Sequence, residues 1–231
     1  RNSQGEGKTR INQKKAKSTA DCATILPVLL FNPERFRLFT DGSKVRRRLM
    51  DWGVFYQSRE FAKTYQYLKR TVDQRNAALK QRRSQSVIQS FDDAFLAQAA
   101  TVDACRQTYT EALFSEVENL MGDFLTQHNI SLHYYRGWGQ DKDLPTLLDE
   151  NFKKDIDAGF TQYGPHRADI RLRVGTALAQ DVLSRGQQKR LIFSLTLAQA
   201  TLYQAHQNQA CVLLLDDVHA ELDAQHFEAL L

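Results

Sequence analysis

The spacing of apolar residues divides the chain into stretches with helical periodicity and stretches with strand periodicity. Residues 43–83 repeat apolar positions at intervals of three and four, which predicts helix. A charge at Arg75 interrupts this stripe, whose members are Phe61, Tyr65, Leu68, Val72 and Leu79. A second helical stripe follows a polar break near Ser84 and comprises Phe91, Phe95, Ala99, Val102, Tyr109, Leu113, Val117, Leu120 and Phe124. The two stripes predict an antiparallel helical arm.

Shorter patterns on both sides of this arm predict strands. Residues 24–31 are apolar and end at Asn32-Pro33, which predicts a buried strand running into a turn. Residues 130–138 and 168–174 alternate between apolar and polar, and Gly175 follows as a turn. Between them, residues 144–156 predict a helix that starts after Asp143 with Pro145 in its first turn.

The last part of the chain combines helix and strand. Residues 187–205 predict a helix, residues 212–215 a strand, and a further helical pattern begins at Ala224. With the earlier strands, this order of elements predicts an α/β fold with a helical insertion.

Composition permits a genuine core, because 42% of the 231 residues are apolar. The net charge of +4 says little about partners, but its distribution is uneven. Residues 1–20 and 44–83 are rich in Lys and Arg, whereas residues 84–125 carry acids and a single base, Arg106. Part of the basic surface of the arm is therefore expected to be matched internally.

Three separated cysteines without a CxxC pair, Cys22, Cys105 and Cys211, predict reduced thiols in a cytoplasmic protein. No run approaches the roughly 18 apolar residues of a membrane span. The sequence starts without an initiator Met and stops at Leu231 inside a helical pattern. We therefore expect a piece of a longer protein.

Gly5 to Thr9 contains the Gly-Lys-Thr triplet of a phosphate-binding loop. That loop requires a Gly five residues before its Gly-Lys pair, where this chain has Asn2, and it leads from a strand into an apolar-periodic helix. Residues 10–15 contain one apolar side chain, Ile11. A charged hairpin is the better prediction.

The apolar run at residues 212–215 is followed by two carboxylates, Asp216 and Asp217. Open α/β sheets bind ligands at the carboxyl ends of buried parallel strands. There Asp216 is placed to hold Mg²⁺ and Asp217 to polarise an attacking water beside a nucleotide. The alternative is a strand capped by acids for solubility.

A Ser-x-Gly-Gln turn opens the predicted helix near residue 187. Ser184 supplies a hydroxyl and an N-cap, Gly186 allows close approach of a phosphate, and the positive end of the helix dipole faces that anion. The alternative is an ordinary capping turn. The carboxylate-ended strand one helix later favours the phosphate interpretation.

Five blocks in order resemble the RecF family of bacterial recombination and gap-repair ATPases, which is related to the SMC and ABC heads. They occupy residues 42–53, 68–79, 163–169, 183–187 and 212–223, so the resemblance covers nearly the whole chain. It implies an α/β fold of the ABC-ATPase class, a head of the P-loop NTPase type that is truncated here and carries an inserted α-helical arm, lobe II.

The resemblance implies three divisions of the chain. Residues 1–40 are a remnant of the first ATPase lobe with its hairpin and strand. Residues 41–158 are the helical arm, and residues 159–231 are the carboxyl-terminal ATPase lobe with the signature and Walker B motifs. The phosphate-binding loop (Walker A) is expected upstream of Arg1, and a switch histidine is expected after Leu231.

The resemblance also implies roles for individual residues around ATP and Mg²⁺. Ser184, Gly186 and Gln187 would contact the γ-phosphate of ATP bound to the other protomer, and Arg185 would read that nucleotide or face solvent. The three carboxylates follow the family as well: Asp216 is the Mg²⁺ ligand, Asp217 the catalytic carboxylate and Asp223 a dimer-loop residue. Asp217 is shorter than the usual Glu, which implies a weak ATPase, and this chain alone is expected to be inactive.

For function, the resemblance implies an ATP-dependent DNA clamp of recombinational repair, replication and the SOS response. Partners would be double-stranded DNA and ss/dsDNA junctions, RecR and RecO, RecA indirectly, and a second copy in an ATP-dependent homodimer; the expected location is the cytoplasm, at the nucleoid. Sequence-blind binding rests on phosphate neutralisation. Candidate phosphate contacts are Arg46, Arg47, Arg48, Lys69 and Arg70.

Two other classes of protein fit the sequence less well. A transport-coupled or other ABC-type ATPase carries a short helical segment before the signature turn, whereas this chain inserts an arm of roughly a hundred residues. A purely structural coiled-coil protein does not account for the strand that ends at Asp216.

Residues 164–167, Gly-Pro-His-Arg, carry no chemistry that the sequence reveals. His166 is equally compatible with a buried, hydrogen-bonded ring and with an active one. The family block continues with two acids, and since the first position here is Ala168, a carboxylate role falls to Asp169 alone.

Overall fold

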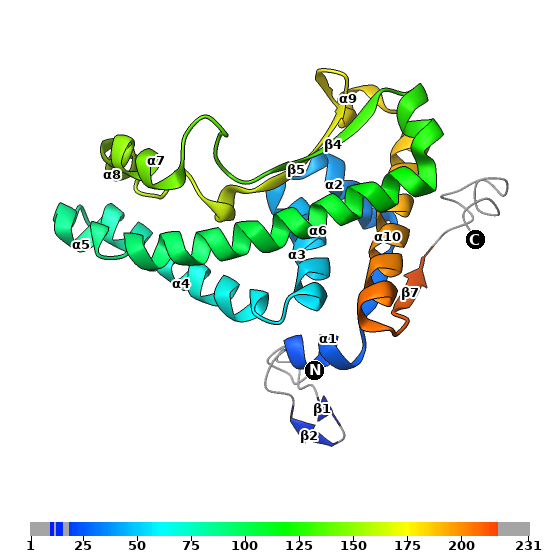
Figure 1. The fold of residues 1–231 in the computed structure, drawn as a ribbon, viewed down its shortest axis with the longest axis horizontal. Coiled ribbons are helices and arrows are strands. Elements are labelled where there is room, and N and C mark those ends of the chain that lie inside the picture. The colour runs from blue at the N-terminus through cyan, green and yellow to red at the C-terminus, as the bar shows by residue number, and fades with distance from the viewer. Residues whose placement is uncertain (1–9, 12, 16–18, 217–231) are drawn as a thin grey trace, which may run out of the picture.

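The computed structural model describes residues 10–11, 13–15 and 19–216. Figure 1 shows a long helix, α6, crossing the molecule, with a small sheet and several short helices on one side and further helices on the other. The elements before the arm are β1 Arg10–Ile11, β2 Lys14–Lys15, α1 Thr19–Ile25, β3 Val28–Phe31, the 3₁₀ turn Pro33–Phe36 and α2 Arg37–Thr40.

The hairpin predicted near the start is confirmed, because β1 and β2 pair antiparallel with Arg10 opposite Lys15. The prediction of a strand over residues 24–31 is partly wrong. Helix α1 runs to Ile25, and the strand begins at Val28, after Pro27. The Gly-Lys-Thr triplet and the helix expected from Ala224 lie outside the described residues.

The helical arm is confirmed. Its helices are α3 Ser43–Gln57, α4 Phe61–Lys80, α5 Gln85–Gln89 and α6 Asp92–Gln127. Helices α4 and α6 pack antiparallel: Arg75, late in α4, pairs with Asp92 at the start of α6, and Phe61 at the start of α4 lies under Arg106 in mid-α6. The charged position that interrupted the apolar stripe, Arg75, is fully buried.

After the arm, a three-stranded antiparallel sheet leads to the last helix. Its strands are β4 Ile130–Tyr135, β5 Asp169–Val174 and β6 Ala177–Leu178, in the order β4-β5-β6. The helices of this part are α7 Leu144–Glu150, α8 Phe152–Ala158, the 3₁₀ turn Pro165–Arg167, α9 Ala179–Val182 and α10 Arg185–Gln207.

Two predicted elements differ in extent. Strand β4 ends at Tyr135 and not at Trp138, because the chain turns at Gly137, whose φ is +106° and whose missing side chain leaves room for the carbonyl of Gly164. The helix predicted for residues 144–156 is two helices that meet at Asn151. The cap at Asp143 is confirmed, since its carboxylate accepts from the amide of Thr146 at 2.8 Å.

Strand β7, Val212–Leu215, pairs parallel with β3, from Val28 opposite Val212 to Phe31 opposite Leu215. The parallel pairing was predicted, but the predicted burial of β7 is wrong: Val212, Leu214 and Leu215 are 39%, 49% and 37% exposed. One face of β3, with Leu29 and Phe31, packs against α10, and the other face has no cover among the described residues.

One hydrophobic core joins these parts. It runs from Phe31 on β3 through the arm to Ala198 on α10, and helices α3, α6 and α10 pack on one another around it. The sheet contributes its inner face, with Ile170 and Leu172. The turn that opens α10 is therefore held by the same core as the arm.

Candidate nucleotide and nucleic-acid sites

The turn at residues 183–187 forms a capping box at the start of α10. The hydroxyl of Ser184 accepts from the amide of Gln187 at 3.3 Å, and the side-chain oxygen of Gln187 accepts from the amide of Ser184 at 2.8 Å. Two of the amides at this helix start are thereby satisfied. Ser184, Arg185 and Gly186 are exposed, so their backbone and the positive helix end face outward.

Gly186 is not required by the fold around it. It lies within α10, and a Cβ atom added to it would meet nothing within 4 Å. Glycine in a helix costs roughly 0.5–1 kcal/mol relative to alanine. A glycine that is unfavourable for the helix and unnecessary for packing leaves bare backbone at an anion-binding helix start.

Two contacts position this turn. The Arg185 guanidinium lies 5.5 Å from the centre of the Phe36 ring, so it is directed along the protein surface. The buried side chain of Gln188 donates to the carbonyl of Leu183 at 2.9 Å and to that of Gln180 at 3.4 Å. Sequence reasoning missed Gln188, although its place directly after the turn marks it as the residue facing inward.

Asp216 lies at the carboxyl end of β7, where its backbone amide donates to the carbonyl of Phe31 at 2.9 Å. The residue is exposed at the carboxyl end of the parallel strand pair, the edge at which open α/β sheets bind ligands. Asp217 and Asp223 lie outside the described residues.

The signature turn and Asp216 lie far apart. Helix α10 has 23 residues, and β7 returns beside it over 4 residues (Figure 1). With these lengths the helix spans about 34 Å and the strand about 13 Å, so about 20 Å of helix separates the two groups. One triphosphate on a single copy cannot contact both at its γ-phosphate.

The five basic candidates divide into two groups. The Arg46 guanidinium donates to both carboxylate oxygens of Asp169, at 2.7 and 3.0 Å. It also donates to the backbone carbonyls of Leu38 and Asp41. Arg47 donates to the carbonyl of Ala168 at 2.7 Å, and burial lowers its pKa. These two arginines are partly buried and are occupied by contacts within the protein.

The other three candidates face solvent. Arg48, on α3, and Lys69 and Arg70, on α4, are exposed. Lys69 and Arg70 line a shallow hollow on the outer surface of α4 together with Gln66, Asp73, Gln74 and Ala77. This surface of the arm offers positive charge that no described acid of the neighbouring helix neutralises through an ion pair.

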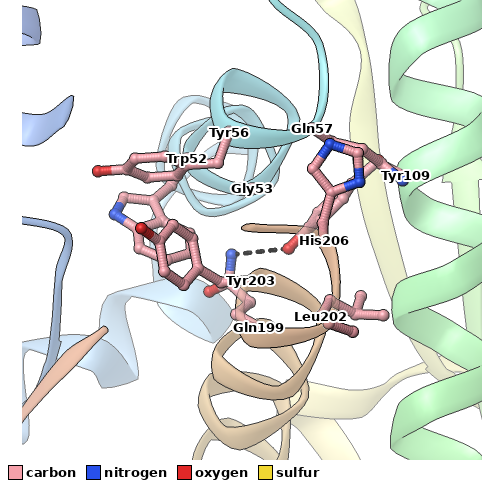
Figure 2. A pocket seen from close by; sticks show the side chains of 10 residues that line it. Trp52, Gly53, Tyr56, Gln57, Tyr109, Gln199, Leu202, Tyr203 and His206 are labelled. Carbon is pink, nitrogen blue, oxygen red and sulfur yellow. Dashed lines mark hydrogen bonds between the residues drawn. The ribbon is translucent and has the colours of Figure 1, made fainter. Parts of the chain in front are cut away.

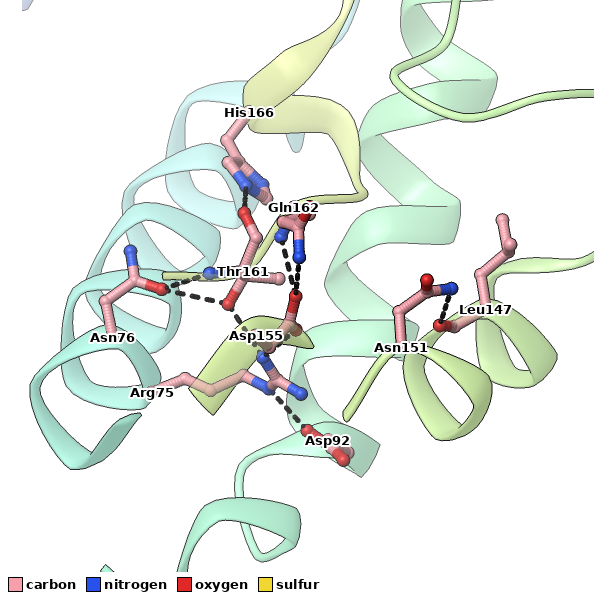
Figure 3. Close-up of polar contacts among 9 residues, drawn as sticks. All are labelled: Arg75, Asn76, Asp92, Leu147, Asn151, Asp155, Thr161, Gln162 and His166. Carbon is pink, nitrogen blue, oxygen red and sulfur yellow. Dashed lines mark hydrogen bonds and ion pairs between the residues drawn. The ribbon is translucent and has the colours of Figure 1, made fainter. Parts of the chain in front are cut away.

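Residues 161–169, which contain the Gly-Pro-His-Arg segment, connect the arm to β5; we refer to them as the connector. Figure 3 shows Arg75 reaching it from α4: the guanidinium pairs with Asp92 at 2.8 Å and with Asp155 at 2.9 Å, and donates to Thr161 at 2.9 Å. The side chain of Asn76 accepts from the amide and the hydroxyl of Thr161.

A second buried arginine holds the connector from α6. Arg106 binds Asp51 of α3 at 2.8 and 3.0 Å and donates to the carbonyl of Pro165 at 2.6 Å. With the contacts of Arg46 and Arg47, four arginines from three helices converge on the connector and the first residue of β5. This gives Asp169 a structural role, and sequence reasoning did not find it.

Of the two alternatives, His166 is the hydrogen-bonded ring, and it is partly buried. Its Nε2 donates to the carbonyl of Thr161 at 2.9 Å (Figure 3). The ring of Phe95 lies 6.2 Å from the His166 ring, centroid to centroid. Burial, assisted by the positive charges of Arg167, Arg47 and Arg75, lowers the pKa of His166 to about 4. The ring is neutral at physiological pH.

A cavity of about 240 Å³ lies between α3, α6 and α10 (Figure 2). Trp52, Tyr56 and Tyr203 pack on one another at its wall. Gln199 donates to the hydroxyl of Tyr109 at 3.1 Å. The Tyr109 ring fills the space that a side chain at Gly53 would need, which explains that glycine. The cavity contains none of the residues predicted for the nucleotide or DNA.

Among the residues that the structure describes, no cluster of three or more His, Cys, Asp or Glu could hold a metal ion. None of the described helices is long and apolar enough to cross a bilayer. The three cysteines form no disulfide, as their spacing predicted.

A parallel strand pair that ends at a carboxylate, a capped glycine-containing turn and an inserted helical arm are features of the ABC-ATPase fold. Over its full 231 residues the chain is 41% identical to the DNA replication and repair protein RecF of Pseudomonas fluorescens strain Pf-5, covering 63% of that protein. It is 38% identical to the same protein of Shewanella baltica strain OS223 over 98% of this chain and 63% of the relative.

Solved structures agree. RecF with ATP, described as a recombination mediator of the RecFOR pathway, superposes with a TM-score of 0.84 over 97% of this chain and 64% of that chain, at 22% identity. A second RecF structure, with an ATP analogue, gives a TM-score of 0.79. No family model matches. The chain is similar to RecF proteins over its full length and has the predicted ABC-ATPase fold; it spans 63% of the length of these curated relatives.

Proposed function

We propose that this chain supplies the signature side of an ATP-dependent clamp on DNA that acts in recombinational repair. The curated relatives are named DNA replication and repair proteins, and the solved neighbours are described as recombination mediators with ATP. Because the chain spans 63% of the relatives' length, the activity of the whole protein belongs to this proposal.

The observation that carries the proposal is Gly186. Its lack of a side chain serves neither the backbone conformation nor the packing of this protein, and it lies exposed at a helix start that can bind an anion. Since about 20 Å of helix separates this turn from Asp216, the phosphate it meets belongs to ATP on a second copy. This arrangement favours an ATP-dependent homodimer.

The residues present fit ATP and Mg²⁺. Asp216 would hold the metal, which would neutralise phosphate charge, and Ser184, Gly186 and Gln187 would contact the γ-phosphate from the other side of the dimer. Arg185, near Phe36, would read the partner's nucleotide. Asp217 and Asp223 keep their proposed roles as catalytic carboxylate and dimer-loop residue, with weak ATPase activity and an inactive isolated chain.

DNA contact is proposed for Arg48, Lys69 and Arg70. Exposed cations bind phosphates without reading sequence, and these three remain free of described ion pairs. For Arg46 and Arg47 the contacts support a different role, attachment of α3 to the connector.

The finer elements of the proposal follow the family. They are action at ss/dsDNA junctions and gaps, promotion of RecA loading with RecO and RecR, a role in the SOS response, location at the nucleoid in the cytoplasm, and the divisions 1–40, 41–158 and 159–231. A transport-coupled ATPase is disfavoured by the arm, which packs into the core of the protein through α3 and α6.

The test uses a protein of the relatives' full length that carries this chain. Gly186→Ala should leave folding intact or stabilise it by about 0.5–1 kcal/mol, because alanine suits a helix better. The same change should abolish ATP-dependent dimerisation in analytical ultracentrifugation, since a methyl group then stands where the phosphate must approach. Ser184→Arg should abolish dimerisation as well.

Gly42→Ala is the matched control. Gly42 is the N-cap residue of α3, so it also lies at the start of a helix. As at Gly186, a Cβ atom added to it would meet nothing within 4 Å. It should leave ATP-dependent dimerisation unchanged. Dimers that form normally with Gly186→Ala and Ser184→Arg would rule out the proposed contact across the dimer.

A further inference from the structure

The outer face of the β4-β5-β6 sheet carries an arginine stacked on an aromatic ring. The pairing register places His133 opposite Arg171, Ser131 opposite Arg173 and Tyr135 opposite Asp169, all on one face. The opposite face is the buried one, with Ile170 and Leu172. The face that we call the outer sheet face therefore presents His133, Tyr135, Arg171 and Arg173.

Arg171 and Tyr135 form a stacked pair. The guanidinium lies 3.7 Å from the centre of the Tyr135 ring, and Arg171 is exposed. One face of the planar guanidinium meets the ring, and the residue is accessible to solvent. Such a plane can take an unstacked nucleobase while its N–H groups bind phosphate.

The face is cationic and partly apolar. Arg173 is fixed at the β5-β6 turn by donating to the carbonyl of Thr176 at 2.6 Å, and Leu178, opposite it on β6, is 45% exposed. The acid on this face, Asp169, is already neutralised by Arg46. Positive charge thus lies beside the partly exposed ring of Tyr135 and the exposed apolar side chain of Leu178.

These features match single-stranded nucleic acid better than a duplex. Side chains on one face of a strand recur about every 6.6–6.8 Å, a spacing that suits successive nucleotides of an extended strand. Proteins that bind single strands combine positive charge with stacking surfaces, and a duplex keeps its bases paired and out of reach of such a surface. The exposed cations of α4 lack a comparable stacked arginine.

We infer that the outer sheet face binds single-stranded DNA, as a surface separate from the arm cations proposed for the duplex. The inference shares with the proposed function only the premise that DNA is the partner. A protein with both surfaces can contact the two kinds of DNA that meet at a gap. In the sequence, β6 is followed directly by α9 and then by the signature turn. A DNA strand bound to the outer sheet face would therefore lie close to that turn.

The test measures binding of this chain to fluorescently labelled oligothymidylate and to a duplex of equal length by anisotropy. The variant R171Q/R173Q should lower affinity for the single strand at least about tenfold and change duplex affinity less than about threefold. Y135L keeps the charges and removes the stacking ring. It should lower single-strand affinity about fivefold and leave the duplex unaffected.

The arm variant K69Q/R70Q is the matched control with the same loss of charge. It should weaken duplex binding and spare the single strand, and circular dichroism should show that all variants are folded. If only the K69Q/R70Q result fails, the proposed duplex surface is wrong and the sheet inference stands. Single-strand affinity within twofold of the parent for R171Q/R173Q, or equal losses for both DNAs, would overturn the inference.

Discussion

The connector and the β3-β7 strand pair differ in what they bury. At the connector, the guanidinium groups of Arg75 and Arg106 are fully buried and paired with carboxylates. In the strand pair, apolar side chains are exposed, as in Leu30 at 40% and Leu214 at 49%. The first region buries charge and the second exposes hydrocarbon, the reverse of the usual distribution.

This difference separates the residues of the recognisable sequence motifs from the residues that stabilise the fold. Ser184, Arg185 and Gly186 of the signature turn are exposed, as is Asp216, and they take little part in packing. The connector contains no recognisable chemistry, yet α3, α4 and α6 all bind it through arginines. Stability and the proposed function therefore depend on different residues, and mutations can affect them separately.

The largest expected effect comes from breaking the charge network of the connector. Arg75→Ala leaves Asp155, which is 1% exposed, without its counter-charge. Removal of one partner of a buried ion pair costs about 3–5 kcal/mol. Urea unfolding followed by circular dichroism should show this loss.

Arg70→Ala is the control, because Arg70 lies on the same helix and is exposed. It should change the free energy of unfolding by less than about 0.5 kcal/mol. A similar small change for Arg75→Ala would mean that the connector does not depend on its buried charge, and the contrast between the two regions would fail.

The second prediction tests the strand pair with two adjacent leucines. Leu29 is 1% exposed against α10, and Leu30 points to the open face. Leu29→Ala should destabilise the chain by about 2–5 kcal/mol. Leu30→Ala should cost less than about 1 kcal/mol, since much of that side chain is in water already.

The measurement is again urea unfolding, on the same chain and at the same pH. Equal losses for the two leucines would show that the face of Leu30 is covered in solution. Such a result would remove the exposed hydrocarbon on which the comparison rests.

Periodicity predicted most of the fold because it reports which face of an element is apolar. The stripes on α4 and α6 gave the antiparallel arm, and the apolar run before Asp216 gave a parallel strand. The burial of that strand was not predictable, because a run of leucines does not reveal how many layers cover it. The break of the first strand at Pro27 shows that local sequence outweighs an apolar run.

The connector could not be predicted for a different reason. Arg75 was visible only as a gap in a stripe, and its partners Asp155 and Thr161 lie 80 and 86 residues further along the chain. Long-range pairing of charges has no periodic signal in the sequence. For the candidate site, the capping turn and the strand end were predictable, whereas the division of five arm cations into internal and exposed groups required the structure.

The third prediction concerns pH and sharpens the description of the connector. The pKa of His166 is lowered to about 4 in the folded protein, against 6.5 for an ordinary histidine. As pH falls below 6.5, the unfolded chain takes up a proton at this position and the folded chain does not, so folding becomes less stable. Between pH 7.5 and pH 5 this group should reduce the free energy of unfolding by about 2 kcal/mol.

His166→Gln isolates this contribution, because glutamine can still donate to the carbonyl of Thr161 and does not titrate. Other groups titrate in both proteins alike, so the quantity to measure is the difference between parent and variant in urea unfolding at several pH values. The parent should lose stability relative to the variant as pH falls from 7.5 to 5. A constant difference would mean that His166 can be protonated within the folded protein, and water would then have to reach the connector that Arg75 and Arg106 hold.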